Sequence, residues 1–107
     1  MKKISLVLIL FLLFFSSLLQ AASGVSKDCS FKGRSLKGKV QIVNSFPDIK
    51  VQVVSYFPDL KVKQVSVFPD HCGEWQFVTS FADFKIQFVN YFPDLKIQFV
   101  DYFPGLP

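Results

Sequence analysis

The stretch KIQFVNYFPDL at Lys85–Leu95 is one copy of an eleven-residue unit that fills most of the chain. A longer copy, CGEWQFVTSFADF, spans Cys72–Phe84 and carries a two-residue insertion, Cys72-Gly73. Each regular copy begins with a lysine. Besides the copy at Lys85, the regular copies begin at Lys39, Lys50, Lys61 and Lys96. A unit this short cannot bury its apolar face alone, so neighbouring copies must cover one another in one compact domain.

Within each unit, the first residues have the composition of a β-strand. Lys50–Tyr56 is rich in β-branched and aromatic residues, which strands favour. Because side chains alternate between the two faces of a strand, Val51 and Val53 begin a mostly apolar face. The other face begins polar at Lys50 and ends apolar at Tyr56. We therefore expect a strand of about seven residues, ~23 Å long, that ends inside the core.

The end of each unit predicts a turn. Proline presets φ for the second position of a type I turn, and aspartate suits the third, where its carboxylate can bond nearby backbone. The residue before a proline favours extended backbone, so Phe57 is expected to remain with its strand. The proline in each regular unit also excludes a continuous helix. The turn positions are Phe46, Pro47, Asp48, Phe57, Pro58, Asp59, Phe68, Pro69, Asp70, Phe81, Ala82, Asp83, Phe92, Pro93, Asp94, Phe103, Pro104 and Gly105.

The beginning of the chain resembles a signal peptide. Lys2 and Lys3 precede an apolar run that small residues follow, and the run is shorter than the ~20 residues that span a bilayer. We expect a signal peptide over 1–21, a linker over 22–28 and one domain over 29–107. The mature protein would then be periplasmic or secreted, monomeric and without a stable membrane span. A retained membrane anchor is the alternative.

Charge gives little support to a nucleic-acid partner. The chain carries 12 Lys and Arg residues against 8 Asp and Glu, and removal of Lys2 and Lys3 leaves 10 − 8, or +2, which is weak for nucleic acid. Half of the positive charge of the mature chain lies in its N-terminal segment, on Lys27, Lys32, Arg34, Lys37 and Lys39. These residues belong either to a solvated hairpin or to a patch that touches anionic lipid or envelope polymer.

Cys29 and Cys72 are the two cysteines of the chain. An even count in an exported domain predicts a disulfide, which would close a loop of about 43 residues and contribute roughly 4 kcal/mol on chain entropy. Two free thiols are the alternative. Cys29–Gly38 is interpreted as a short strand or hairpin that enters the sheet. The insertion of Cys72 and Gly73 predicts a bulge or a crossing between layers.

Candidate catalytic and metal-binding residues do not form a convincing set. Asp70, His71, Cys72 and Glu74 are close in sequence, but zinc needs three or four converging ligands, and adjacent residues do not converge easily. The aspartates that recur at the turns could form a calcium row, but turn chemistry explains them better. We therefore predict no catalytic, cofactor-binding or metal site, and no enzyme activity.

Two other repeated residue types have a structural and a functional interpretation. The lysines that start the regular units form a basic stripe, or they protect a sheet edge and pair with turn aspartates; we favour the second interpretation. The aromatic residues Tyr56, Tyr91, Tyr102 and Trp75 form a platform for sugars or bases, or they pack in the core. Their regular positions favour core packing.

These residues together resemble a known family. The resemblance rests on the repeated Phe-Pro-Asp units, on CGEWQFV at Cys72–Val78, on SFADFKI at Ser80–Ile86 and on the closing FPG at Phe103–Gly105. They resemble the 7(1) septoil knot domain family of small bacterial proteins over Cys29–Pro107. The resemblance implies a compact all-β domain whose backbone is a 7(1) torus knot, and no biochemical activity. From the residues alone, an antiparallel sandwich, a small barrel and a β-solenoid all stay open.

Two functions are compatible with this sequence. The first is an exported, non-enzymatic domain that resists unfolding and proteolysis. The second is a binding module for an envelope ligand, either anionic lipid or glycan, that uses the basic N-terminal segment or exposed aromatic residues. Exposure of the tyrosines and Trp75 distinguishes the two, because a binding surface must be accessible.

Overall fold

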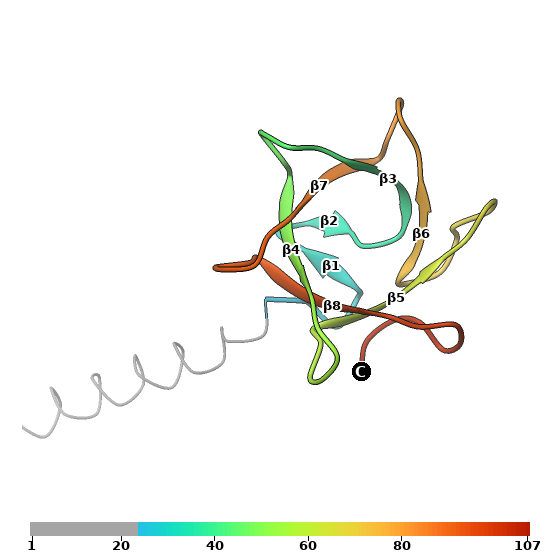
Figure 1. Cartoon of the computed structure of the whole chain (residues 1–107). Coiled ribbons are helices and arrows are strands. Elements are labelled where there is room, and N and C mark those ends of the chain that lie inside the picture. The colour runs from blue at the N-terminus through green and yellow to red at the C-terminus, as the bar shows by residue number, and fades with distance from the viewer. Residues whose placement is uncertain (1–23) are drawn as a thin grey trace, which may run out of the picture.

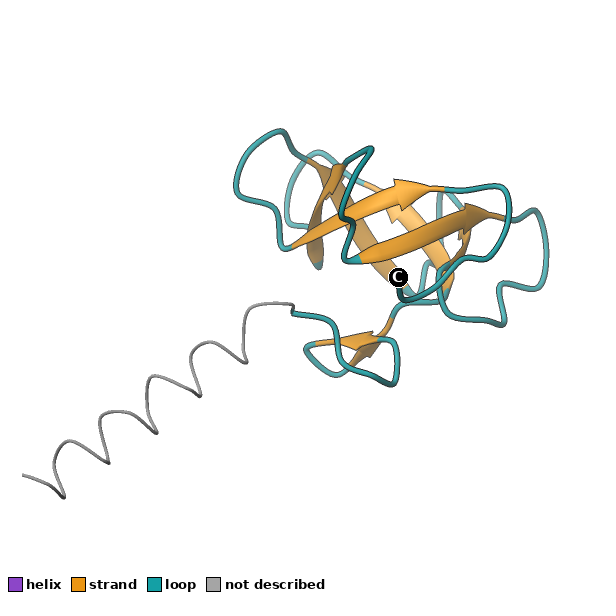
Figure 2. Cartoon of the chain, turned by 90° about the horizontal axis from the view of Figure 1, so that it is seen from below, coloured by secondary structure: helices purple, strands orange, loops and turns teal. Residues whose placement is uncertain are grey.

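The computed structural model describes residues 24–107, so the expected signal peptide over 1–21 lies outside the described residues. The domain is all-β (Figures 1 and 2). No helix in the described part is long and apolar enough to cross a membrane. The strands are β1 (Ser30–Phe31), β2 (Arg34–Ser35), β3 (Gly38–Ile42), β4 (Ile49–Val53), β5 (Leu60–Gln64), β6 (Glu74–Phe77), β7 (Phe84–Phe88) and β8 (Leu95–Phe99).

Strands β3 to β8 form a closed barrel in the ring order β3-β6-β5-β8-β4-β7, and every pairing in it is parallel. A small barrel is thus the correct choice among the sequence-based alternatives. Parallel neighbours usually need a crossover of a dozen or more residues. Here the strands are so short that an extended segment such as 54–59 returns to the same end of the barrel. A closed barrel leaves no free edge, so edge protection does not explain the repeated lysines.

The chain makes two interleaved laps around the barrel. From β3 to β4 and from β4 to β5 it skips one place in the ring, and the skipped places are later filled by β7 and β8. The step from β5 to β6 is different, because these strands are immediate neighbours. A third skip would have returned the chain to the place of β3. The irregular unit with Cys72-Gly73 therefore starts the second lap, and it is neither a simple bulge nor a crossing between layers.

The strands are shorter than the sequence predicted. The unit expected to be a strand over Lys50–Tyr56 pairs only over Ile49–Val53. Its first and third residues point into the barrel and are buried, whereas Val53 is half exposed. The same pattern recurs in the other regular strands. The buried apolar residues are Cys29, Phe31, Leu36, Val40, Ile49, Val51, Leu60, Val62, Trp75, Phe84, Ile86, Leu95 and Ile97.

A two-stranded antiparallel hairpin, β1 and β2, covers one end of the barrel (Figure 2). This hairpin does not enter the barrel sheet, contrary to expectation. Its Phe31 and the following Leu36 are buried in the core. The Leu36 carbonyl accepts hydrogen bonds from the Gly73 N–H at 3.1 Å and from Trp75 Nε1 at 3.0 Å. The hairpin therefore closes the end at which the strands begin, which we call the plugged end.

Four of the five repeated aspartates connect distant units rather than their own turns, and the exception, Asp70, donates its N–H to the Phe68 carbonyl at 2.9 Å. Asp94 donates its N–H to the Lys50 carbonyl at 2.8 Å, and its Oδ2 accepts the Lys50 N–H at 2.8 Å. The same double contact joins Asp83 to Lys39, Asp48 to Lys85 and Asp59 to Lys96. The expectation of bonds to nearby backbone is thus wrong for these four carboxylates, whose partners lie 37 or 44 residues away.

The last unit replaces this aspartate with Gly105, which exchanges two backbone hydrogen bonds with Lys61, each 2.8 Å long. Gly73 lies against the same pair and has a φ of 80°. A Cβ atom on Gly73 would collide with the Lys61 carbonyl oxygen and the Gly105 nitrogen. Glycine is therefore required at position 73, both for its backbone conformation and for the close approach of the last unit.

Candidate functional site

Each of the six segments that follow a barrel strand contains one strongly exposed phenylalanine. The φ angles of these phenylalanines lie between 52° and 57°, a left-handed conformation that is unfavourable for bulky residues. Their exposed fractions are 78–94%. The prediction that Phe57 stays extended with its strand is therefore wrong. We call these residues the tip phenylalanines: Phe46, Phe57, Phe68, Phe81, Phe92 and Phe103.

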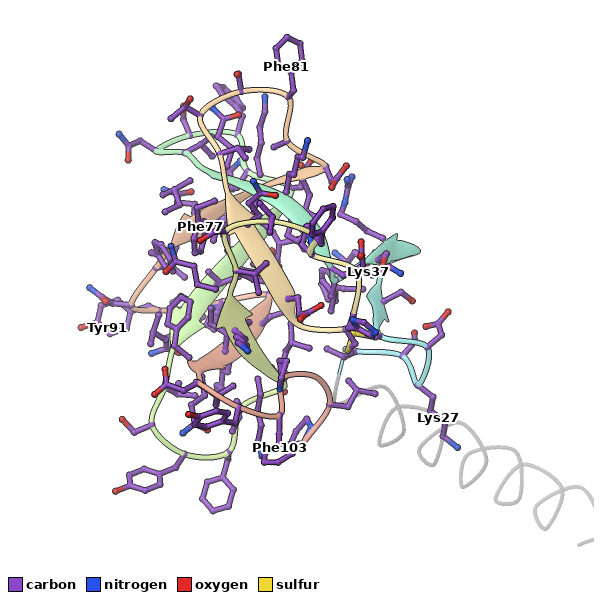
Figure 3. The ribbon with its side chains drawn as sticks, turned by 90° about the vertical axis from the view of Figure 1, so that its right-hand side faces the viewer. Lys27, Lys37, Phe77, Phe81, Tyr91 and Phe103 are labelled. Atoms are coloured by element: carbon purple, nitrogen blue, oxygen red, sulfur yellow. A yellow bond between two sulfur atoms is a disulfide. The ribbon has the colours of Figure 1, made fainter. Side chains whose placement is uncertain are left out.

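The segments that carry the tip phenylalanines project outward around the barrel (Figure 1). A crossover that skips one strand must pass outside that strand, because side chains fill the barrel interior. The segments that carry Phe92, Phe57 and Phe103 consequently follow one another around the ring, outside β4, β8 and β5. In Figure 3, Phe81 and Phe103 point away from the barrel on opposite sides.

A tyrosine precedes each phenylalanine of that group of three. Tyr56, Tyr91 and Tyr102 are 75–79% exposed, so the prediction that they pack in the core is wrong. Trp75 is completely buried and makes edge-to-face contacts with Phe77 and Phe84. The structure thus separates two aromatic groups that the sequence placed together: tyrosines accessible to a partner, and a tryptophan that serves packing.

The second apolar surface is the end of the barrel opposite the hairpin. Here each strand contributes its last inward-facing residue, and nothing within residues 24–107 covers them. The exposed fractions are 51% for Ile42 and Val53, 40% for Phe88 and 42% for Phe99. We call this surface the mouth, which consists of Ile42, Val53, Gln64, Phe77, Phe88 and Phe99.

Two shallow grooves border the mouth. One has a volume of about 300 Å³ and is lined by Gln41, Ile42, Phe77, Val78 and Thr79. The other, of about 460 Å³, is lined by Lys63, Gln64, Val65, Ser66, Phe99, Val100 and Asp101. Neither groove contains histidine or cysteine, and each has at most one carboxylate. The first groove offers mainly apolar and amide contacts, whereas the second adds one lysine, one aspartate and one serine hydroxyl.

Charged residues are concentrated away from the mouth. The six segments that run from the mouth to the tips read QIVNSF, QVVSYF, KQVSVF, QFVTSF, QFVNYF and QFVDYF, at 41–46, 52–57, 63–68, 76–81, 87–92 and 98–103. Lys63 and Asp101 are their only charged residues. In Figure 3, Tyr91 lies at the end of the molecule opposite Lys27 and Lys37. The protein is therefore polarised along the barrel axis.

The plugged end carries the basic N-terminal segment and the disulfide. Cys29 and Cys72 are bonded, with Cα atoms 5.9 Å apart, so the predicted pairing is present. Arg34 Nη2 lies 3.6 Å from Asp48 Oδ1, and Lys37 Nζ donates to the Asp70 carbonyl at 3.1 Å. No repeated lysine forms an ion pair with a turn aspartate within residues 24–107. Lysine and aspartate are linked through the lysine backbone instead.

His71 and Glu74 form a local pair at the same end. Glu74 Oε1 accepts the His71 N–H at 2.8 Å and lies 3.0 Å from His71 Nδ1. Burial alone raises the pKa of the Glu74 carboxyl. The hydrogen bonds and charge from His71, with a backbone hydrogen bond from Asp70, outweigh burial and hold the pKa below its ordinary value. Cys72 is in the disulfide, and no three His, Cys, Asp or Glu residues in the described part are grouped to hold a metal ion.

These observations define a small, disulfide-bonded β-barrel made of tandem repeats, with one capped end and one apolar end. The chain belongs to the 7(1) septoil knot domain family, whose model matches residues 33–107. The family name implies a 7(1) knotted backbone, with which the two interleaved laps are compatible.

A curated relative is the uncharacterized protein slr1025 of Synechocystis sp., which is 73% identical over 48 residues. The match covers 45% of this chain and 43% of the relative, so it spans less than half the length of either protein. Neither the family description nor the name of this relative refers to an enzyme.

Proposed function

We propose that this protein is an exported, non-enzymatic module that holds exposed aromatic side chains in place for an envelope ligand. One observation carries this proposal: six phenylalanines are both exposed and held in the left-handed conformation. Such backbone strain costs about 1–3 kcal/mol per residue, and burial of the rings does not offset it. A bulky apolar residue is disfavoured at such a position unless its ring has a contact to make.

The rest of the domain suits a module that must persist outside the cell. Barrel closure removes the strand edges, and the disulfide connects the hairpin to the start of the second lap. Proteolysis of the native state requires opening, and few segments of this barrel can open independently. The disulfide is consistent with the periplasm or the extracellular space. Our proposal keeps the signal peptide at 1–21, the linker at 22–28 and the domain at 29–107.

The absence of catalytic chemistry is also part of the proposal. His71 is exposed and is paired with Glu74 at the plugged end. Both grooves lie at the other end of the barrel. Lys63, Ser66 and Asp101 line one of them, but among the described residues no hydrogen bond joins the Ser66 hydroxyl to a base, and covalent hydrolytic catalysis needs such a pairing. A monomer that binds neither metal nor nucleic acid fits these features.

A six-site variant tests the aromatic contact. Asparagine tolerates the left-handed conformation, so Phe→Asn at all six tips removes the rings and leaves the backbone unstrained. Exported wild-type protein should be retained on insoluble peptidoglycan or on lipid vesicles, and the variant should lose at least tenfold in retention.

The control variant removes the five repeated lysines, Lys39, Lys50, Lys61, Lys85 and Lys96, by Lys→Gln substitution. It tests the basic stripe as an alternative binding surface, and we expect its retention to stay within about twofold of the wild type. The proposal is wrong if wild-type protein is retained on neither material. It is equally wrong if the tip variant is retained as well as the wild type.

A further inference from the structure

The mouth suggests a more specific partner than the tips alone. Ile42, Val53, Phe88 and Phe99 are 40–51% exposed, and they lie at the same end of a closed barrel whose other end the hairpin caps. Exposed apolar residues scattered singly need no explanation, but a contiguous group marks an interaction surface. Its position at one end of the axis means that a partner must approach end-on.

We propose that the open end of this barrel docks on a lipid bilayer, with the mouth against the boundary between headgroups and acyl chains. The inference rests on the proposed function, since it names the ligand of the exposed aromatic side chains. It places the barrel axis roughly along the membrane normal and the plugged end in water.

The distribution of charge favours this orientation. The six segments between the mouth and the tips contain only Lys63 and Asp101 as charged residues. These two have opposite charge and line the same groove, so the open end is close to neutral. Moving a charged side chain toward a bilayer interior costs free energy, and the open end has almost no charged side chains. The basic residues of the hairpin lie at the far end, as Lys27 and Lys37 show in Figure 3.

The tyrosines suit the rim of such a contact. Tyr56, Tyr91 and Tyr102 precede the tips in chain order, on the side of each crossover that leaves the mouth. Figure 3 shows Tyr91 at the extreme of the open end. Tyrosine has an apolar ring and a polar hydroxyl, and it is enriched where a bilayer meets water.

A second copy of the chain fits this surface less well. Four half-exposed side chains at the mouth present on the order of 300 Å², whereas a stable interface buries about 800 Å² on each partner. The projecting tyrosine rim also prevents two rigid ends from meeting flat. A fluid lipid surface can follow an uneven rim, so a bilayer is the better occupant.

Lipid charge provides the first test of this orientation. Protein recovered after export is sedimented with vesicles of phosphatidylcholine alone, or of phosphatidylcholine with phosphatidylglycerol. Because the opposite charges of Lys63 and Asp101 leave the docking surface close to neutral, we expect affinities for the two vesicle types to agree within about threefold. Raising the salt concentration should change them little.

Two variants with equal net charge provide the second test. Ile42→Glu with Val53→Glu adds two negative charges at the mouth, where the side chains are half exposed. Lys27→Gln with Lys32→Gln removes two positive charges at the plugged end. The mouth variant should bind phosphatidylcholine vesicles at least tenfold more weakly, and the plugged-end variant should match the wild type. All chains share one N-terminus, so any leader contributes equally, and circular dichroism shows whether each variant is folded.

Several results would overturn the inference. Binding that requires phosphatidylglycerol and disappears in the Lys27 and Lys32 variant would assign lipid contact to the basic hairpin. A dimer in sedimentation velocity that the mouth variant abolishes, without vesicle binding, would assign the mouth to a second copy. Absence of vesicle binding together with tip-dependent retention on peptidoglycan would reject the bilayer and leave the proposed function intact. Equal vesicle binding by the mouth variant and the wild type would also reject it.

Discussion

The two ends of the barrel are built from the same repeated unit, yet they differ in almost every physical property. The plugged end is capped by Phe31 and Leu36, held by the disulfide and surrounded by charge. The open end exposes Phe88 and Phe99 and is nearly uncharged. All barrel strands run in parallel, so a position within the unit becomes a height along the axis. A tandem repeat in a parallel barrel therefore produces rings of one residue type.

The largest expected difference between the ends comes from truncating one aromatic residue in each. Trp75 is completely buried and donates to the Leu36 carbonyl, so Trp75→Ala should cost about 3–5 kcal/mol in free energy of unfolding. Phe99 is 42% exposed, so Phe99→Ala should cost only about 1–2 kcal/mol. Guanidinium unfolding of both variants measures this difference. Equal costs would mean that the mouth is as well packed as the plugged end.

The second largest effect on stability is expected from the disulfide, and we expect it mainly at the plugged end. Replacing both Cys29 and Cys72 with serine releases a loop of 43 residues and should cost about 2–4 kcal/mol. Limited proteolysis should then cleave first within residues 29–38, because the hairpin loses its covalent connection to the barrel. First cleavage within the crossovers of the open end would contradict this assignment.

The tip phenylalanines should behave oppositely to core phenylalanines. Phe57→Asn removes an exposed ring from a left-handed position, so it should leave stability unchanged or raise it by up to about 1 kcal/mol. Phe84 is 2% exposed, and Phe84→Ala is the contrasting control, with a loss of about 3–5 kcal/mol. Thermal unfolding measures both. A loss above about 1 kcal/mol for Phe57→Asn would show that the tip has a packing role.

The smallest effect concerns acid stability at the plugged end. The pKa of Glu74 is lower in the folded protein than its ordinary value of about 4.3. The ionised carboxyl therefore stabilises the fold above that value, and this contribution disappears as pH falls through the folded pKa. Glu74→Gln should be slightly less stable than wild type at pH 6, and the difference should shrink below pH 4. A difference in Tm that is constant from pH 6 to pH 3 would contradict this.

Several features of the fold follow from local rules applied to the sequence. The eleven-residue period indicates one strand and one turn per unit, and the alternation of side chains correctly places Val51 on a buried face. The even cysteine count predicts the bond between Cys29 and Cys72, which the structure confirms. These predictions depend on residue type and short spacing, which the sequence displays directly.

The candidate site was less predictable. Phe57 and Tyr56 were expected to belong to the core, because an aromatic residue is usually buried when a strand continues through it. In the structure the strand ends at Val53, and the chain must leave the barrel to pass outside β8. The mouth was not predicted at all. Its one signal in the sequence is the apolar fifth residue of four strands. Without the structure, such a residue is interpreted as part of the core, because the sequence does not show that this end of the barrel is uncovered.

By itself, the sequence determined the repeat, the alternation that buries one face of each strand, and the pairing of two cysteines. Tertiary structure alone decided that the strands are parallel, that the second lap fills the gaps of the first, and that four of the repeated aspartates each bind a lysine backbone 37 or 44 residues away. The physical reason is that nearly identical units offer nearly identical local interactions. Only closure of the whole barrel distinguishes one partner from another, and the same closure leaves aromatic rings outside and one apolar end uncovered.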